Sequence, residues 1–118
     1  MKNKYLFMAS MDVEPNKQQV FDDVYDTEHV PYLSAVPGVI SIARFQTEPL
    51  RIAIGGEVKN IVINDQPKHT AIYEIESPEV LISSEWSDAV ERGSWPTQVR
   101  PFTNNRRHIL LGAMKRNN

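Results

Sequence analysis

The sequence predicts an α+β fold in which a four-stranded antiparallel sheet carries two helices on one face. Three observations support this prediction. The chain has 118 residues, which suits one domain spanning residues 1–118. Its β-prone and helical segments follow one another as β-α-β and again as β-α-β, in two halves of similar size. The β-prone segments show little polar alternation, so both faces of the sheet need cover. The simplest arrangement of two such halves is the ferredoxin-like fold.

The first half opens with a β-prone run from Tyr5 to Met11 that is apolar on both faces. A helix begins near Pro15, because proline suits the first helical turn. Pro31 is expected to interrupt this helix, and the turn Pro37-Gly38 leads into a second strand from Val39 to Phe45. Six residues recur at the spacing of a helix and share one of its faces: Val20, Phe21, Val24, Tyr25, Glu28 and His29.

The second half repeats this order. A third strand runs from Thr70 to Ile75 and is followed by Ser77-Pro78, a favourable N-cap and first helical residue. The second helix is predicted to continue to about Gly93, with Ser83 or Ser84 as an internal restart. Its apolar positions are Val80, Leu81, Trp86, Ala89 and Val90.

Two further segments complete the chain. A proline-containing loop from Trp95 to Asn105 leads to the last strand, His108 to Met114. Residues 48–68 have no place in the minimal fold, and their two β-prone runs around Gly55-Gly56 predict a hairpin or extended arm rather than a long surface loop. Such an arm would extend the sheet, cross to a partner or cover the mouth of a pocket.

The sheet face turned away from the helices is expected to form a homodimer. The apolar character of both faces of Tyr5 to Met11 and of His108 to Met114 motivates this prediction. Burying a few large side chains per subunit there would contribute several kcal/mol before association costs, at roughly 25 cal/mol per Å².

Composition excludes several classes of protein. Hydrophobic residues make up 41% and charged residues 24%, as in ordinary globular proteins. The net charge of -2 gives no basic footprint for nucleic acid. The chain has no cysteine, which excludes disulfides, thiolate nucleophiles and zinc–thiolate sites. No segment reads as a signal peptide or a membrane span, so we expect a cytoplasmic protein without a membrane partner.

His29 is the leading candidate for chemistry, because the unperturbed pKa of a histidine lies near neutrality and suits proton transfer. Tyr25 lies four residues before it and Asp26 three, so either side chain could orient the ring. The alternative is a histidine that ends a helix, complements the helix dipole and does no chemistry.

Arg44 is the one charged residue of its predicted strand, and a buried arginine needs an anion or several acceptors. It could pair with Glu74 or Glu28, or meet a substrate carboxylate or phenolate. Arg44 or Arg106 could also stabilise a developing oxyanion, although solvated charges are the alternative for both.

Four aromatic side chains complete the candidate substrate-binding set. Trp95 lies beside Pro96 in a loop and is expected to form a pocket wall, whereas core packing is the alternative for Trp86. His69 and His108 each begin a predicted strand, where a surface position is the alternative.

Neither a metal nor another cofactor is expected. The three histidines show no His-x-His or His-x-x-x-His spacing, and a metal site would need carboxylates as well. A single histidine could in principle hold haem, but the chain is small and offers little apolar helix around it.

Several motifs carry a resemblance to a known family. They are Tyr25-Asp26-Thr27-Glu28-His29-Val30-Pro31, Val36-Pro37-Gly38-Val39, residues 73–80, Ser84-Glu85-Trp86, Trp95-Pro96, Arg100-Pro101 and Asn105-Arg106-Arg107. Together they resemble the EthD-like branch of the dimeric α+β-barrel superfamily over most of the chain except residues 48–68. The resemblance implies a ligand cavity between the sheet and its own helices, dimerisation through the backs of the sheets, and a cavity-facing His29.

The resemblance leaves the reaction open, because the superfamily includes cofactor-free monooxygenases, polyketide cyclases, lactone isomerases and haem proteins. We expect a small cofactor-free catabolic enzyme of the isomerase, cyclase, dehydratase or lyase type. His29 would move a proton on a hydrophobic aromatic or cyclic metabolite. One alternative is cofactor-independent oxygenation of a phenolic substrate, and another is a non-catalytic accessory protein that binds a small molecule.

Overall fold

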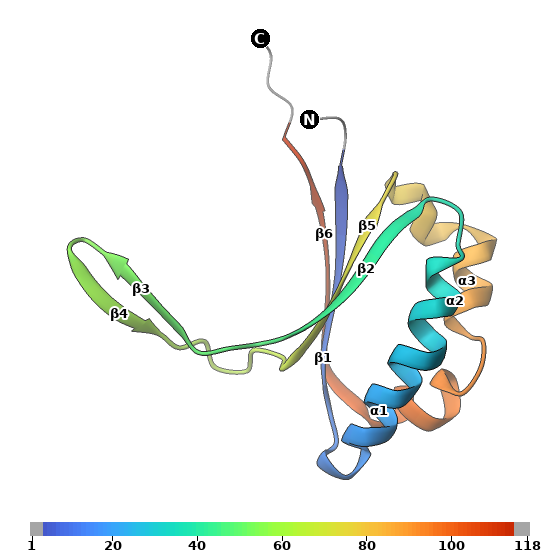
Figure 1. Cartoon of the computed structure of the whole chain (residues 1–118), viewed down its shortest axis with the longest axis horizontal. Coiled ribbons are helices and arrows are strands. Elements are labelled where there is room, and N and C mark those ends of the chain that lie inside the picture. The colour runs from blue at the N-terminus through green and yellow to red at the C-terminus, as the bar shows by residue number, and fades with distance from the viewer. Residues whose placement is uncertain (1–3, 115–118) are drawn as a thin grey trace.

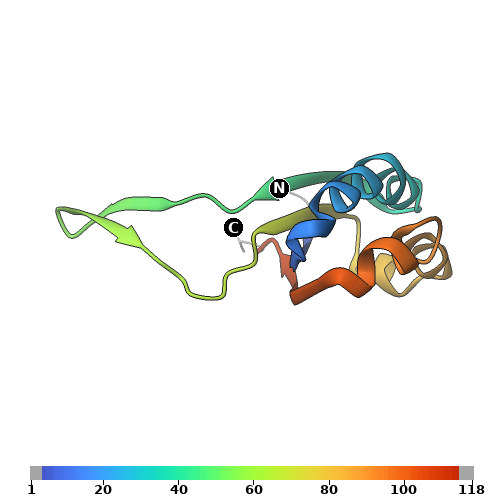
Figure 2. The same ribbon diagram turned by 90° about the horizontal axis from the view of Figure 1, so that it is seen from below.

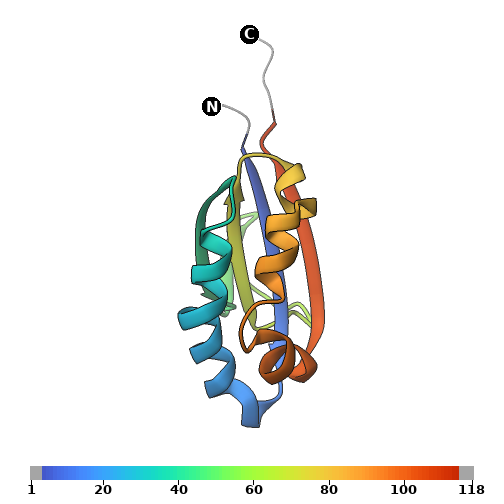
Figure 3. The same ribbon diagram turned by 90° about the vertical axis from the view of Figure 1, so that its right-hand side faces the viewer.

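The computed structural model describes residues 4–114. It confirms the predicted α+β fold: a four-stranded antiparallel sheet with helices packed on one face (Figures 1 and 3). The strand order is β2-β5-β1-β6, as expected of a ferredoxin-like arrangement. The strands are β1 (Tyr5–Val13), β2 (Val39–Gln46), β5 (His69–Ile75) and β6 (Thr103–Gly112).

The first helical segment runs without a break from Pro15 to Ser34. It consists of η1 (Pro15–Lys17), α1 (Gln18–Val24), the π-helical turn η2 (Tyr25–His29) and α2 (Val30–Ser34). The predicted interruption at Pro31 is therefore wrong. The proline lies in the first turn of α2, and the wide turn before it closes with a bond from the Val30 N–H to the Tyr25 carbonyl. The wide turn accommodates a proline that lacks an N–H and would crowd an ordinary α-helical turn.

The second helical segment, which lies beside the first on the same face of the sheet (Figure 3), is broken into short pieces. The predicted restart is confirmed, because the Ser83 hydroxyl accepts a hydrogen bond from the Trp86 N–H at 3.1 Å and so caps the helix. The segment from Trp95 to Asn105, expected to be a loop, is largely helical and gives way to β6 at Thr103. The pieces are η3 (Pro78–Ile82), α3 (Ser84–Val90), η4 (Trp95–Val99) and η5 (Arg100–Phe102).

The core lies between the sheet and the helices. Along β5 the inward positions Ala71, Tyr73 and Ile75 are buried and alternate with partly exposed residues. Phe21 and Leu33 from the first helical segment pack against this face and are fully buried. Within residues 4–114, no helix is both long and apolar enough to cross a membrane.

The opposite face of the sheet has no helix over it (Figure 1). Ile109 pairs with Met8 on this face, and Phe45 lies there opposite Thr70. Ile109 is 47% exposed and Phe45 53% exposed. We call this surface the open face.

Residues 48–68 contain a second, two-stranded sheet that projects away from the body on the open-face side (Figures 1 and 2). We call it the arm, formed by β3 (Leu50–Ile54) and β4 (Glu57–Ile61). Its turn is Gly55-Gly56, where both glycines have positive φ, as a tight hairpin turn requires. The expectation of a hairpin arm is confirmed. The strand register places Leu50, Ile52, Ile54 and Ile61 on one face of the arm.

The two ends of the described chain are neighbours in the sheet. Tyr5 pairs with Gly112, and the Ala113 N–H donates to the Lys4 carbonyl at 2.8 Å. These two strand ends lie at the end of the sheet opposite the base of the arm (Figure 1).

Candidate functional site

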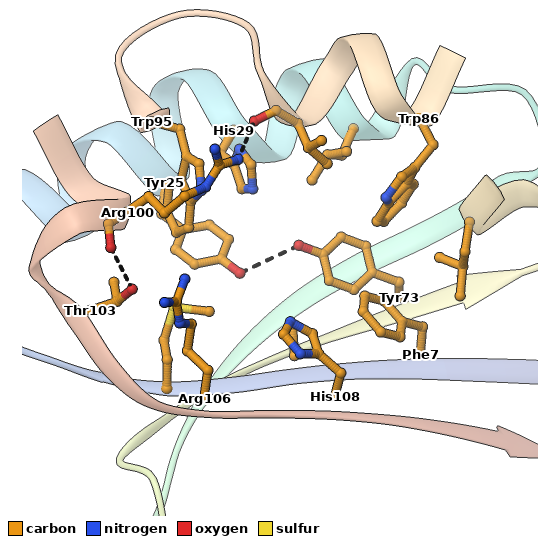
Figure 4. Close-up of a pocket in the computed structure, with 15 residues that line it drawn as sticks. Phe7, Tyr25, His29, Tyr73, Trp86, Trp95, Arg100, Thr103, Arg106 and His108 are labelled. Atoms are coloured by element: carbon orange, nitrogen blue, oxygen red, sulfur yellow. Dashed lines mark hydrogen bonds between the residues drawn. The ribbon is translucent and has the colours of Figure 1, made fainter. Parts of the chain in front are cut away.

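A cavity of about 360 Å³ lies between the helices and the inner face of the sheet (Figure 4). This volume falls in the range typical of small-molecule sites, roughly 300–1,000 Å³. Aromatic and aliphatic side chains form most of its wall, and a few polar groups converge on it. Six residues of the predicted set line it: Tyr25, His29, Trp86, Trp95, Arg106 and His108.

His29 comes from the π-helical turn η2, and only 5% of its surface is exposed. Its ring stacks on Trp95 with centroids 4.0 Å apart and an interplanar angle of 10°. The helix continues past His29 to Ser34, so His29 does not complement a helix end as the alternative supposed.

The surroundings of His29 keep its imidazole neutral. Burial is the largest influence and the Arg100 charge the second, and together they lower the pKa of His29 to about 4. The buried Nδ1 atom has no hydrogen-bond partner among the described residues. Buried polar atoms are rarely left unpaired, so Nδ1 is a basic nitrogen that the surrounding protein does not engage.

Local packing fixes the partner ring, Trp95, against the helix that carries His29. The Ser94 N–H donates to the Glu28 carboxylate at 2.8 Å. The preceding Gly93 has φ +73°, and a Cβ there would collide with the Glu28 carboxylate and press on Tyr32. Glycine at position 93 therefore allows the close approach that brings Trp95 onto His29.

Two tyrosine hydroxyls meet inside the site. The Tyr25 and Tyr73 oxygens are 3.3 Å apart and form a buried hydrogen bond (Figure 4). Burial raises the pKa of both phenols, most strongly that of Tyr73. Both therefore remain protonated donors at neutral pH. Tyr73 is absent from the predicted site, although its alternation with Ala71 and Ile75 already places it on the inner face of the strand.

Strand β6 supplies Arg106 and His108, which both point into the cavity from below in Figure 4. The His108 ring stacks on Phe7 with centroids 5.8 Å apart. His108 lies in the middle of β6 rather than at the strand start predicted for it. A bulge at Asn105, which has φ +51°, keeps both Thr103 and Arg106 on the helix side of the strand.

Asp26 and Arg44 are not part of the cavity wall, contrary to the predicted catalytic set. The Arg44 guanidinium donates to Asp22 and to Asp26, each at 2.8 Å. It does not pair with Glu74 or Glu28, which instead contact Lys4 and the Ser94 N–H. Asp26 is engaged by this ion pair and therefore does not orient His29. The Arg44 guanidinium lies 4.6 Å from the centroid of the Tyr25 ring, so it packs behind that cavity residue.

His69 also lies outside the main cavity. It is buried at the start of β5, tilts against Phe21 and shares a hydrogen bond of 3.2 Å with the Gln18 side chain. The sequence predicted that His69 begins a strand, and β5 does begin there.

Arg100 lines the cavity, although it is not among the predicted site residues. Its guanidinium donates to both oxygens of Glu91, at 2.9 Å from Nη1, and to the Val90 carbonyl at 3.3 Å. Within residues 4–114, no cluster of three or more histidine, aspartate or glutamate side chains is placed to hold a metal ion.

Comparison with known proteins identifies the fold. No protein-family model matches the sequence, and no curated protein matches it. An EthD family protein from Bacillus halodurans is similar in structure, with a TM-score of 0.56, 13% identity and coverage of 93% of this chain and 99% of that one.

Two other solved structures are similar. One is a proposed antibiotic biosynthesis monooxygenase from Nitrosomonas europaea (TM-score 0.54, 11% identity, 94% and 99% covered). The other is Rv0793 from Mycobacterium tuberculosis (TM-score 0.53, 11% identity, 99% and 98% covered). At these identities the likeness concerns the fold, and at that level the resemblance to EthD-family proteins is confirmed.

Proposed function

We propose that the protein is a small enzyme in which His29 transfers a proton on a hydrophobic aromatic or cyclic substrate. The reaction would be of the isomerase, cyclase, dehydratase or lyase type. The observation that carries the proposal is a buried, cavity-lining imidazole with an unpartnered Nδ1 and a pKa of about 4. Such a ring is in its unprotonated form at neutral pH, which is the form a general base needs, although its lowered pKa makes it a weaker base than a free histidine.

The remaining residues fall into supporting roles under this proposal. His29 removes a proton from the substrate, and negative charge develops on a substrate oxygen. The Tyr25–Tyr73 hydroxyl pair lies in the same cavity, and the hydroxyl that accepts the bond between them keeps its own O–H to donate to that oxygen. Trp95 holds the His29 ring by stacking, and Arg44 with Asp26 holds Tyr25 from outside the cavity.

The proposal includes a homodimer formed through the open face. Exposed apolar side chains on that face, among them Phe45 and Ile109, support this assembly. Catabolic use and a cytoplasmic location remain part of the proposal as well.

Proton transfer can be tested without knowing the substrate. Carbon acids, including cyclic ketones, lactones and phenylacetic acid derivatives, are incubated with the protein in D₂O, and exchange of the acidic C–H is followed by NMR. We expect His29→Ala to lower the exchange rate about 10²–10⁴-fold, the usual contribution of a positioned base. His29→Gln should not restore the rate, because glutamine does not accept a proton at neutral pH.

His69→Gln is the matched control, since His69 is a buried histidine outside this cavity. Near wild-type exchange in His29→Ala would reject the proposal. Consumption of O₂ with a phenol, abolished by the same substitution, would identify an oxygenase instead. Saturable ligand binding with neither reaction would identify a binding protein.

A further inference from the structure

The charged side chains on the cavity wall are of one sign. They are Arg100 and Arg106, and the wall contains no aspartate or glutamate. The two tyrosines of the wall stay uncharged, because burial raises their pKa. An anionic ligand would therefore meet no repelling carboxylate inside the cavity.

Arg100 is already compensated by the protein. Glu91 accepts two hydrogen bonds from its guanidinium, and the Val90 carbonyl accepts a third. A ligand anion gains little from an arginine whose fork is occupied in this way.

Arg106 differs in this respect. Its guanidinium makes no hydrogen bond or ion pair within the part of the chain that the structure describes. Arg106 is exposed to solvent and at the same time lines the cavity, where the bulge at Asn105 keeps it on the helix side of the strand. Its neighbour Arg107 behaves differently, because its side chain donates to the Asp65 carbonyl at 2.8 Å.

The opposite end of the cavity is aromatic and aliphatic. Phe7, Tyr73 and Trp86 contact one another there, with ring centroids 5.4 to 5.9 Å apart (Figure 4). Leu81 and Val90 also line the cavity. The cavity therefore matches a ligand with an apolar ring at one end and a hydrogen-bond-accepting anion at the other.

We propose that the substrate is an aromatic or cyclic carboxylic acid whose carboxylate binds Arg106. The planar guanidinium presents two parallel N–H groups, which match the two oxygens of a carboxylate. The ring would occupy the space beside Phe7 and Trp86, and His29 would face the carbon skeleton between the two ends. The inference rests on the proposed function only in taking this cavity as the substrate site.

The test compares two probes of one shape, 4-tert-butylbenzoate and its uncharged amide, 4-tert-butylbenzamide. Both tryptophans of the chain line the cavity, so intrinsic fluorescence reports binding there directly. We expect the carboxylate to bind the full-length protein about ten-fold more tightly than the amide, as a charged hydrogen bond allows. Arg106→Gln should remove this preference and leave amide binding unchanged, whereas Arg107→Gln should keep it. Added salt should weaken only carboxylate binding.

The inference is overturned if the wild-type protein binds both probes equally or binds no carboxylate. It is also overturned if Arg106→Gln and Arg107→Gln reduce carboxylate binding alike. This outcome is separate from that of the proton-transfer test. Preferred carboxylate binding without C–H exchange would reject the proposed reaction and keep Arg106 as an anion site. His29→Ala is expected to retain the preference for the carboxylate.

Discussion

At the scale of single residues, the environment of His29 links the site to stability. In the unfolded chain its pKa is close to 6.5, and in the folded protein it falls to about 4. As the pH drops, the unfolded state takes up the proton first. The stability present above pH 6.5 is therefore lost progressively as the pH falls toward 4.

His29→Phe removes this titration and retains an aromatic ring against Trp95. We expect the wild-type protein to lose about 3 kcal/mol of unfolding free energy relative to the variant across this window, from the size of the pKa shift. Urea unfolding at closely spaced pH values measures the difference. Comparing the two proteins cancels the titration of His69, which they share. Parallel stability profiles would show that His29 is solvated.

The Tyr25–Tyr73 pair gives a second prediction. Replacing either tyrosine by phenylalanine leaves one buried hydroxyl unpaired, which costs about 1–3 kcal/mol. The double variant removes both hydroxyls and should cost less than the sum of the single changes. A double-mutant cycle measured by urea unfolding gives this coupling, and strict additivity would mean that the two hydroxyls do not interact in solution.

The sequence predicted three residues that line the cavity, His29, Trp86 and Trp95, but it predicted the wrong ion-pair partners for Arg44. The three cavity residues could be recognised from their own positions in helical or loop segments. The partners of Arg44 depend on how a helix lies over a strand, which spacing along the chain does not reveal. The aspartates one helical turn apart, Asp22 and Asp26, would have been a better choice than Glu28, since i and i+4 share a helix face.

At the scale of elements, the junction before η4 decides where Trp95 lies. Gly93→Ala should destabilise the protein by about 1–2 kcal/mol, because alanine is strained at positive φ and its Cβ would strike Glu28. The displacement should also change tryptophan fluorescence. Gly55→Ala is the control, since Gly55 has φ +63° but no atom within 4 Å of an added Cβ. Equal losses in the two variants would mean that the Glu28 contact does not matter.

The sequence predicted the strands, the arm and the restart at Ser83, because alternation, paired glycines and caps are local signals. It did not predict the π-helical turn at Tyr25–His29. Proline normally ends a helix, and its accommodation here depends on one extra residue in the preceding turn. The helical character of residues 95–102 was also missed, since two prolines there suggested a loop.

At the scale of the whole molecule, the open face and the arm leave much apolar surface in water for a single chain. An isolated two-stranded hairpin is marginally stable, so the apolar side of the arm favours packing against a second copy. We expect a dimer at micromolar concentration by light scattering. A monodisperse monomer would contradict the proposed assembly.

Ile109→Lys should shift this equilibrium toward the monomer, because a lysine on the open face opposes burial. Ile82→Lys is its control: Ile82 is 78% exposed and belongs to η3, in the helical layer. A dimer weakened equally by both substitutions would place the interface elsewhere.

The pairing of Tyr5 with Gly112 places the two ends of the described segment next to each other. A short linker could therefore join Ala113 to Lys4, and new ends could be opened between Gly55 and Gly56 at the exposed tip of the arm. Such a circular permutant would keep every strand pairing of the main sheet and every wall of the cavity. It would leave the two strands of the arm without the turn that joins them. Comparing its assembly with that of the original chain would therefore measure how much the connected arm contributes to dimer formation.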